Sequence, residues 1–118
     1  MKEYQLQIKL INHLKSRNLS KLRFFHIPNQ GIRSVRYKML LSNMGMKAGC
    51  PDLILEFKNG KIVYIELKSK KGSLSKAQKL WHNKSIALKT PHYILKGEVN
   101  DLKIQLNDII KTLRNITK

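Results

Sequence analysis

Residues 52–68 read DLILEFKNGKIVYIELK and predict a β-hairpin. Two runs rich in aliphatic and aromatic residues, 52–57 and 61–68, flank the segment Lys58-Asn59-Gly60, which is typical of a tight turn. We therefore expect two antiparallel strands that pair with each other. This pairing brings the beginning of the first strand beside the end of the second.

Apolar periodicity and turn-forming residues indicate helices and short strands in the rest of the chain. Helices are expected from Glu3 to about Arg17, from Ile32 to Met44, from Ser75 (as N-cap) to Leu88 and from Asn100 to Leu113, and strands at Leu22–Ile27 and His92–Leu95. This order predicts an α/β fold with a mixed β-sheet flanked by helices. A chain of 118 residues suits one domain, so we expect a single domain over residues 1–118.

The expected first helix has an acidic residue in an unusual place. Its apolar side is predicted from residues at helical spacing, namely Tyr4, Ile8, Leu10, Ile11 and Leu14. At about 100° per residue, Glu3 falls inside the apolar arc beside Leu10 and Leu14, where a carboxylate is seldom found. A second interpretation is that Glu3 lies in the first helical turn because negative charge is favoured there.

The charge of the chain favours a polyanionic partner. It has 24 Lys and Arg residues against 7 Asp and Glu residues, a formal net charge of +17. Each phosphate neutralised by Lys or Arg releases condensed counterions, so nucleic acid is the expected partner. An anionic membrane is the rival, but the apolar runs are far shorter than the roughly 20 residues of a transmembrane helix.

Cysteine and histidine usage argues against a disulfide or zinc framework. Cys50 is the single cysteine and has no partner for an internal disulfide, and the four histidines lack metal-ligand spacing. Polar residues interrupt the N-terminal segment, which therefore does not resemble a signal peptide. We expect a cytoplasmic protein.

Three ionisable residues are expected to meet at one end of the hairpin. Side chains on a strand alternate between faces, so Glu66 and Lys68 share a face, and Asp52 begins the strand that pairs with theirs. Carboxylates suit a hard divalent cation that activates water for phosphodiester hydrolysis, and an ammonium group stabilises developing negative charge. The spacing alone equally allows a salt bridge between Glu66 and Lys68, with Asp52 capping a turn. Glu56, on the same face as Asp52, is an alternative ligand.

Several motifs occur in the order found in a nuclease family. The sequence resembles the PD-(D/E)XK nuclease superfamily, and more closely the VRR-NUC domain family, in two linked motifs. The first is Gly45, three residues and then Gly49-Cys50-Pro51-Asp52, and the second, thirteen residues later, is Glu66-Leu67-Lys68. The resemblance extends from the first helix through the last strand. It implies a restriction-endonuclease-like core and a nuclease activity.

The resemblance also implies roles for individual residues. Asp52 and Glu66 would bind Mg²⁺ or Mn²⁺ together with the backbone carbonyl of Leu67, and Lys68 would assist the attacking water. Glu3 would reach the metal through water. Two further candidates come from the resemblance, Gln78 in the segment Leu74-Ser75-(x)2-Gln78, which would orient water or phosphate, and Asn29 in Asn29-Gln30-Gly31. The alternative for Gln78 is an ordinary surface position on a helix.

The stand-alone proteins that the chain resembles act as homodimers on branched DNA. The resemblance and the small size of the domain together predict a homodimer that cuts branched or four-way-junction (Holliday junction) DNA. The small lone domain suggests a phage or mobile element as its context. Lysines close to the motif in sequence are candidates for a phosphate-contacting rim, and the alternative is a solvated basic surface that attracts nucleic acid non-specifically: Lys58, Lys61, Lys70, Lys71, Lys76 and Lys79.

Two other function classes stay open. A non-catalytic, basic nucleic-acid-binding module would be equally cationic, but it has no use for Asp52 and Glu66, because carboxylates repel phosphates unless a metal intervenes. An interaction subunit is the third class, since the apolar stripe between Leu102 and Leu113 suits a dimer as well as a core.

Overall fold

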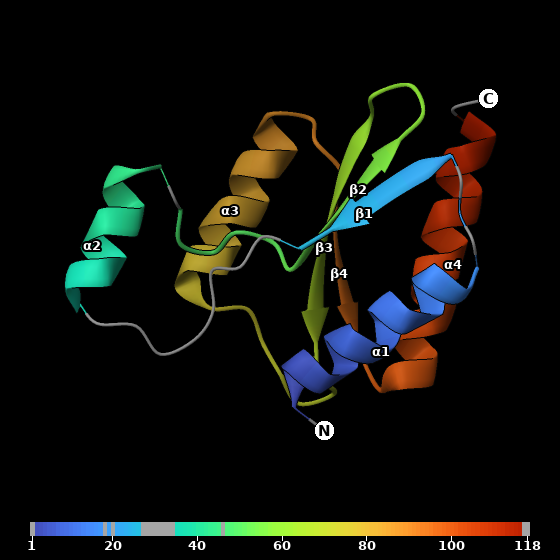
Figure 1. Cartoon of the computed structure of the whole chain (residues 1–118), viewed down its shortest axis with the longest axis horizontal. Helices are drawn as coiled ribbons and strands as arrows, with labels where there is room; N and C mark the ends of the chain where they lie inside the picture. Colours follow the sequence, from blue (N-terminus) through green and yellow to red (C-terminus); the bar gives the residue numbers. More distant parts are fainter. Residues whose placement is uncertain (1, 18, 20, 27–34, 46, 117–118) are drawn as a thin grey trace.

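The fold is an α/β sandwich around a four-stranded sheet (Figure 1). The computed structural model describes residues 2–17, 19, 21–26, 35–45 and 47–116. In chain order the elements are α1 (Glu3–Ser16), β1 (Leu22–Phe25), α2 (Val35–Asn43), β2 (Leu53–Phe57), β3 (Ile62–Lys68), α3 (Lys76–Ala87), β4 (His92–Lys96) and α4 (Val99–Ile116). The predicted fold class, a mixed sheet flanked by helices, is confirmed.

The strands lie in the order β1-β2-β3-β4. The first three are antiparallel neighbours, and the predicted hairpin is β2–β3, in which Leu53 lies opposite Ile65. Gly60, with φ +83°, closes its turn by donating its N–H to the carbonyl of Phe57 at 2.9 Å. β4 is parallel to β3, because α3 carries the chain back to the end where β3 begins. The carboxyl ends of β3 and β4 therefore lie side by side.

One face of the sheet holds the hydrophobic core. Alternate residues of β2 and β3 point to this face, where α1 and α4 cover them (Figure 1). The core consists of Leu6, Leu10, Leu14, Leu53, Leu55, Phe57, Val63, Ile65, Leu67, Leu95, Leu102, Leu106, Ile110 and Leu113. Burial of each such side chain stabilises the fold by about 1.5–3 kcal/mol, so the pattern of two along the hairpin fixes which residues face the other way.

The opposite face of the sheet lies against α3. Tyr64 on β3 meets Trp81 of α3 edge-to-face, with ring centroids 5.9 Å apart. Trp81 therefore packs against the sheet. The face that carries Tyr64 also carries Glu66 and Lys68, so α3 covers the chemically active side of the hairpin.

The expected apolar side of α1 is wrong in part. Tyr4 and Ile8 are more than half exposed, whereas Leu6 is buried with Leu10 and Leu14. Leu6, Leu10 and Leu14 are spaced four residues apart, so each is rotated by about 40° from the one before and the three span about 80° of the helix. Glu3 belongs to this buried arc, one turn before Leu6, and the arc directs it toward the end of β3.

Most element boundaries agree with the sequence to within a few residues. α4 begins one residue earlier than expected and ends three later, and β4 extends to Lys96. Residues 27–34 include Asn29 and the expected start of the second helix, and they lie outside the described residues. No described helix is both long and apolar enough to cross a bilayer.

Candidate active site

A tight loop holds Asp52 at the start of β2. Gly49 has φ +80°, and a Cβ built there would lie 2.3 Å from the backbone oxygen of Ala77 in α3. Only glycine permits so close an approach between this loop and the helix. The ring of His26, just after β1, donates its Nδ1–H to the carbonyl oxygen of Asp52. The backbone at Asp52 is thus fixed from both sides.

The Asp52 carboxylate is hydrogen-bonded to the neighbouring strand. Its Oδ2 accepts the backbone N–H of Leu67 at 2.8 Å, and the residue is 5% exposed. The N–H and C=O of one strand residue point to the same side of the strand, so the Leu67 carbonyl is directed toward Asp52 as well. Asp52 therefore does more than cap a turn.

A helix cap positions the Glu66 carboxylate. Gln78 Nε2 donates to Glu66 Oε1 at 2.7 Å. Gln78 is itself held by Ser75, whose N–H donates to Gln78 Oε1 at 2.8 Å and whose Oγ accepts the Gln78 N–H at 3.2 Å. This reciprocal pair is the capping box that begins α3, and it confirms Ser75 as the N-cap. Gln78 is therefore more than a surface helix residue.

Glu66 and Asp52 form an electrostatically unfavourable buried pair. Glu66 is 1% exposed, and its Oε2 accepts no hydrogen bond from a donor among the described residues. Burial, and next the negative charge of Asp52, raise the pKa of Glu66 to about 8. When Asp52 and Glu66 are both ionised, their carboxylates can only accept hydrogen bonds. A single proton on one of them would let that carboxyl group donate a hydrogen bond to the other. Without a proton or a cation, the pair is destabilising.

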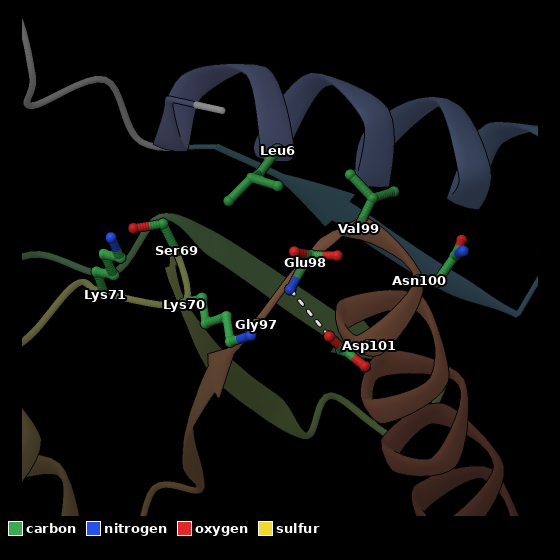
Figure 2. A pocket seen from close by; sticks show the side chains of 9 residues that line it. All are labelled: Leu6, Ser69, Lys70, Lys71, Gly97, Glu98, Val99, Asn100 and Asp101. Carbon is green, nitrogen blue, oxygen red and sulfur yellow. Dashed lines mark hydrogen bonds between the residues drawn. The ribbon is translucent and has the colours of Figure 1, made fainter.

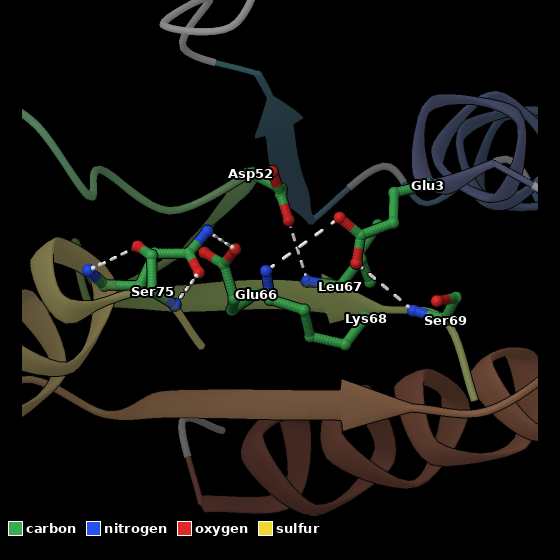
Figure 3. A network of polar contacts seen from close by, with 8 residues as sticks. Glu3, Asp52, Glu66, Leu67, Lys68, Ser69 and Ser75 are labelled. Carbon is green, nitrogen blue, oxygen red and sulfur yellow. Dashed lines mark hydrogen bonds and ion pairs between the residues drawn. The ribbon is translucent and has the colours of Figure 1, made fainter. Parts of the chain in front are cut away.

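Lys68 is paired with Glu3 rather than with Glu66. Figure 3 shows the Lys68 ammonium group between the two carboxylates, with its Nζ 3.9 Å from Glu3 Oε1. Glu3 Oε2 accepts the backbone N–H of Ser69 at 3.3 Å. Glu3 thus fixes the end of β3, and the simple salt bridge between Glu66 and Lys68 that the sequence allowed is not the one present.

Several other candidates lie elsewhere. Glu56 pairs with Arg23 and lies near the turn end of the hairpin. Lys58 and Lys61 flank the same turn, opposite the end that carries Asp52, so their expected place in the phosphate rim is wrong. Lys58 and Lys61 are close to Asp52 in the sequence, but the length of β2 separates them from it in space. Asn29 lies outside the described residues.

Sequence reasoning missed two histidine contacts. One is His26 with Asp52, whose partners are 26 residues apart and leave no local signal. The other is between His82 on α3 and His92 on β4, whose Nδ1 atoms lie 3.2 Å apart. Burial, and next the neighbouring His82, lower the pKa of His92 to about 4. Both histidines belong to the packing between α3 and the sheet.

A cavity near the site is lined by residues other than its carboxylates. A cavity of about 910 Å³ lies beyond the ends of β3 and β4, where Leu6, Lys70 and Gly97 are among the residues that line it (Figure 2). Asp52 and Glu66 do not line this cavity.

The residues fit a hard divalent cation, although they do not form a complete protein cage. Among the described residues, no group of three or more His, Cys, Asp or Glu side chains gathers closely enough to hold a metal ion. Asp52 and Glu66 supply carboxylate oxygens, and Glu66 Oε2 has no donor among the described residues. Mg²⁺ usually keeps several waters and takes only one or two carboxylates. The donor set therefore matches such an ion, with the Leu67 carbonyl as a further oxygen.

Comparison with known proteins agrees with this geometry. Residues 1–97 match the family model of the VRR-NUC domain. The curated proteins and the solved structures gave no match. The matched segment contains α1, the whole sheet and α3, and therefore every residue of the candidate site. The chain belongs to the VRR-NUC domain family, which is a family of nucleases.

Proposed function

We propose that the protein is a DNA endonuclease that depends on Mg²⁺ or Mn²⁺, with Asp52, Glu66 and Lys68 at its centre. The observation that carries this proposal is the buried pair of carboxylates beside a buried ammonium group. Lys68 is 7% exposed, and removal of its charge and those of Asp52 and Glu66 from water is costly. In a chain of net charge +17, such a cluster calls for a function that uses it.

The proposed chemistry is hydrolysis of a phosphodiester. Water attacks phosphorus, one P–O bond breaks, and the leaving oxygen takes up a proton. A divalent cation held by Asp52, Glu66 and the Leu67 carbonyl would polarise the phosphate and make the water more acidic. Lys68 would hold the attacking water or stabilise the charge that develops on the phosphate.

The remaining residues have supporting roles in this proposal. Glu3 positions the Lys68 ammonium group through the contact at 3.9 Å, and it would reach the metal through a bridging water. Gln78 fixes the rotamer of Glu66 through Oε1 and leaves Oε2 available. Residues that orient a metal ligand in this way typically change metal affinity by about 10- to 100-fold when they are replaced.

A non-catalytic nucleic-acid-binding module is the alternative. It would need the same positive charge but not the pair of Asp52 and Glu66, which repels phosphate in the absence of a cation. The hydrogen bonds from Leu67 and Gln78 hold these carboxylates in place at the cost of burial. This arrangement favours the enzyme.

A panel of labelled DNAs tests the activity. Linear duplex, single-stranded and four-way-junction DNA are incubated with wild type in Mg²⁺, Mn²⁺ or EDTA, beside Lys68→Ala. We expect cutting that requires the metal, is lost in Lys68→Ala, and is fastest on the junction, as the family resemblance suggests. Tight binding with no cutting under any metal would favour the binding module instead.

We also propose that the protein acts as a homodimer. α2 stands away from the sheet in Figure 1, and Tyr37, Met39 and Leu40 on it are 49% or more exposed. A helix of nine residues is marginal in water without packing. A second copy that covers α2 would bury these side chains and give two cutting sites for a branched substrate.

Sedimentation of the wild type and of Leu40→Lys tests the dimer. We expect a dimer mass for wild type and a monomer mass for the variant, with the helical signal in circular dichroism largely kept. A monomer mass for wild type at working concentration would contradict the homodimer and leave the nuclease proposal standing.

A further inference from the structure

Lys96 lies beside Lys68 in the sheet. β3 and β4 are parallel, and the register pairs Glu66 with Ile94 and Lys68 with Lys96. Paired residues of neighbouring strands lie about 4.8 Å apart and point to the same face. Lys96 is therefore on the face of the candidate site, one strand further out than Lys68. The sequence does not reveal this neighbour, because 28 residues separate the two lysines along the chain.

The two lysines differ in burial and in partners. Lys68 is buried and pairs with Glu3, whereas Lys96 is exposed and forms no ion pair with any residue that the structure describes. The backbone of Lys96 is nevertheless fixed, because Gln105 Nε2 donates to its carbonyl at 3.1 Å. Lys96 thus presents a free ammonium group from a rigid strand at the edge of the site.

The charges of the site leave a need for such a group. Glu3, Asp52 and Glu66 supply three carboxylates when ionised, and Lys68 supplies one ammonium group. A bound divalent cation would bring these four side chains to neutrality and no further. A DNA strand carries a negative charge at every phosphate, so attraction for the strand must come from cations around the centre. Two ammonium groups on adjacent strands repel each other, and consecutive phosphates of one DNA strand, one near each lysine, would offset that repulsion.

The other cations near the strand ends are less suited to this task. Lys70 and Lys71 follow β3 and line the cavity of Figure 2, but Glu98 and Asp101 line the same cavity. These acidic side chains would oppose a phosphate there. The register position of Lys96, in contrast, places it next to Lys68 itself.

We propose that Lys96 binds the backbone phosphate adjacent to the scissile one and so sets the position of the DNA strand over Asp52, Glu66 and Lys68. This inference rests on the proposed nuclease function. It makes Lys96 a substrate-binding residue, whose loss weakens DNA binding without removing the metal ligands or Lys68.

The experiment compares Lys96→Gln with Lys58→Gln as the matched control. Lys58 is an exposed lysine at the turn end of the same sheet, away from the site. Binding of labelled duplex and junction DNA is measured by fluorescence anisotropy in Ca²⁺ over a range of salt concentrations. Cleavage is measured in Mn²⁺ over a range of DNA concentrations.

We expect Lys96→Gln to weaken DNA binding about three- to tenfold and to reduce the slope of log affinity against log salt by about 1. The KM should rise by a similar factor, while kcat at saturating DNA and the affinity for Mn²⁺ stay within about twofold of wild type. Lys96→Arg should restore binding because it keeps the charge. Lys58→Gln should match wild type in the slope.

The binding and cleavage results separate this inference from the nuclease proposal. If wild type cuts DNA but Lys96→Gln has the same salt slope and KM as Lys58→Gln, the Lys96 inference is overturned alone. If wild type binds DNA but never cuts it, and Lys96→Gln but not Lys58→Gln reduces the slope of log affinity against log salt, the nuclease proposal fails while the phosphate contact stands. If Lys96→Gln lowers kcat at saturating DNA and leaves binding unchanged, Lys96 acts in the chemistry and the inference is overturned.

Discussion

Replacement of Glu66 by Gln should stabilise the metal-free protein at pH 8. The pKa of Glu66 is raised from its ordinary value of 4.5 to about 8, first by burial and next by the charge of Asp52. Since the folded state holds this proton more tightly than the unfolded chain does, the contribution of Glu66 to stability is complete below pH 4.5 and is lost as pH rises to about 8. Gln is neutral at every pH and keeps an acceptor for Gln78.

The size of the effect follows from the shift. Each unit of pKa difference corresponds to about 1.4 kcal/mol, so ionisation of Glu66 destabilises the folded protein at pH 8 by an order of about 4 kcal/mol. Because Glu66 is 1% exposed, solvent screens little of this. A small domain is stable by about 5–15 kcal/mol in total. Even half of the effect would be a large share of its stability.

The assay is urea unfolding of wild type and Glu66→Gln between pH 5 and pH 9 in EDTA. The difference between the two proteins should be small at pH 5 and grow with pH in favour of the variant. His92, whose lowered pKa gives the opposite trend as pH falls below its ordinary 6.5, is present in both proteins and cancels in the difference. Addition of Mn²⁺ at pH 8 should stabilise wild type more than the variant. A variant that is less stable than wild type at pH 8 in EDTA would refute this reasoning.

Three further predictions concern the loop, the helix cap and the lysine. Gly49→Ala should destabilise the fold by more than about 2 kcal/mol because its Cβ would overlap the backbone of α3. Gly45→Ala is the control: φ there is +103°, but no atom of the described residues lies within 4 Å of the added Cβ, so the substitution should cost about 1 kcal/mol. Equal losses in thermal unfolding would contradict the close packing at Gly49. Gln78→Ala should weaken Mn²⁺ binding about 10- to 100-fold in calorimetry by releasing Glu66, and unchanged affinity would remove that role. Lys68→Ala should lower the single-turnover cleavage rate by about 10²- to 10⁴-fold with an unchanged circular dichroism spectrum, and near-normal cutting would exclude Lys68 from the chemistry.

The fold was largely predictable because its decisive patterns are local. The period of two in residues 62–68 and the turn at Gly60 specify the hairpin, and the capping box at Ser75 specifies the start of α3. The apolar side of α1 was predicted less well. Apolar periodicity placed Tyr4 and Ile8 on the buried side of α1. In the fold, Leu6 is buried instead, and Tyr4 and Ile8 are more than half exposed.

The site was predictable in its members but not in its contacts. Local spacing puts Glu66 and Lys68 on one face, and the hairpin brings Asp52 beside them. The pairing of Lys68 with Glu3 depends on how α1 crosses the sheet, which no local pattern encodes. The neighbourhood of Lys96 depends on the parallel register of β3 and β4, which the sequence likewise does not specify.

The most direct test of the central claim is the single-turnover cleavage rate of Asp52→Asn against that of Glu56→Gln. Each variant removes one negative charge. Asp52 lies at the start of β2, whereas Glu56 lies near the far end of the same strand, where it pairs with Arg23. With junction DNA and Mn²⁺, we predict loss of at least about 10²-fold for Asp52→Asn and a rate within about twofold of wild type for Glu56→Gln. Equal rates for the two variants would contradict an active site built on Asp52.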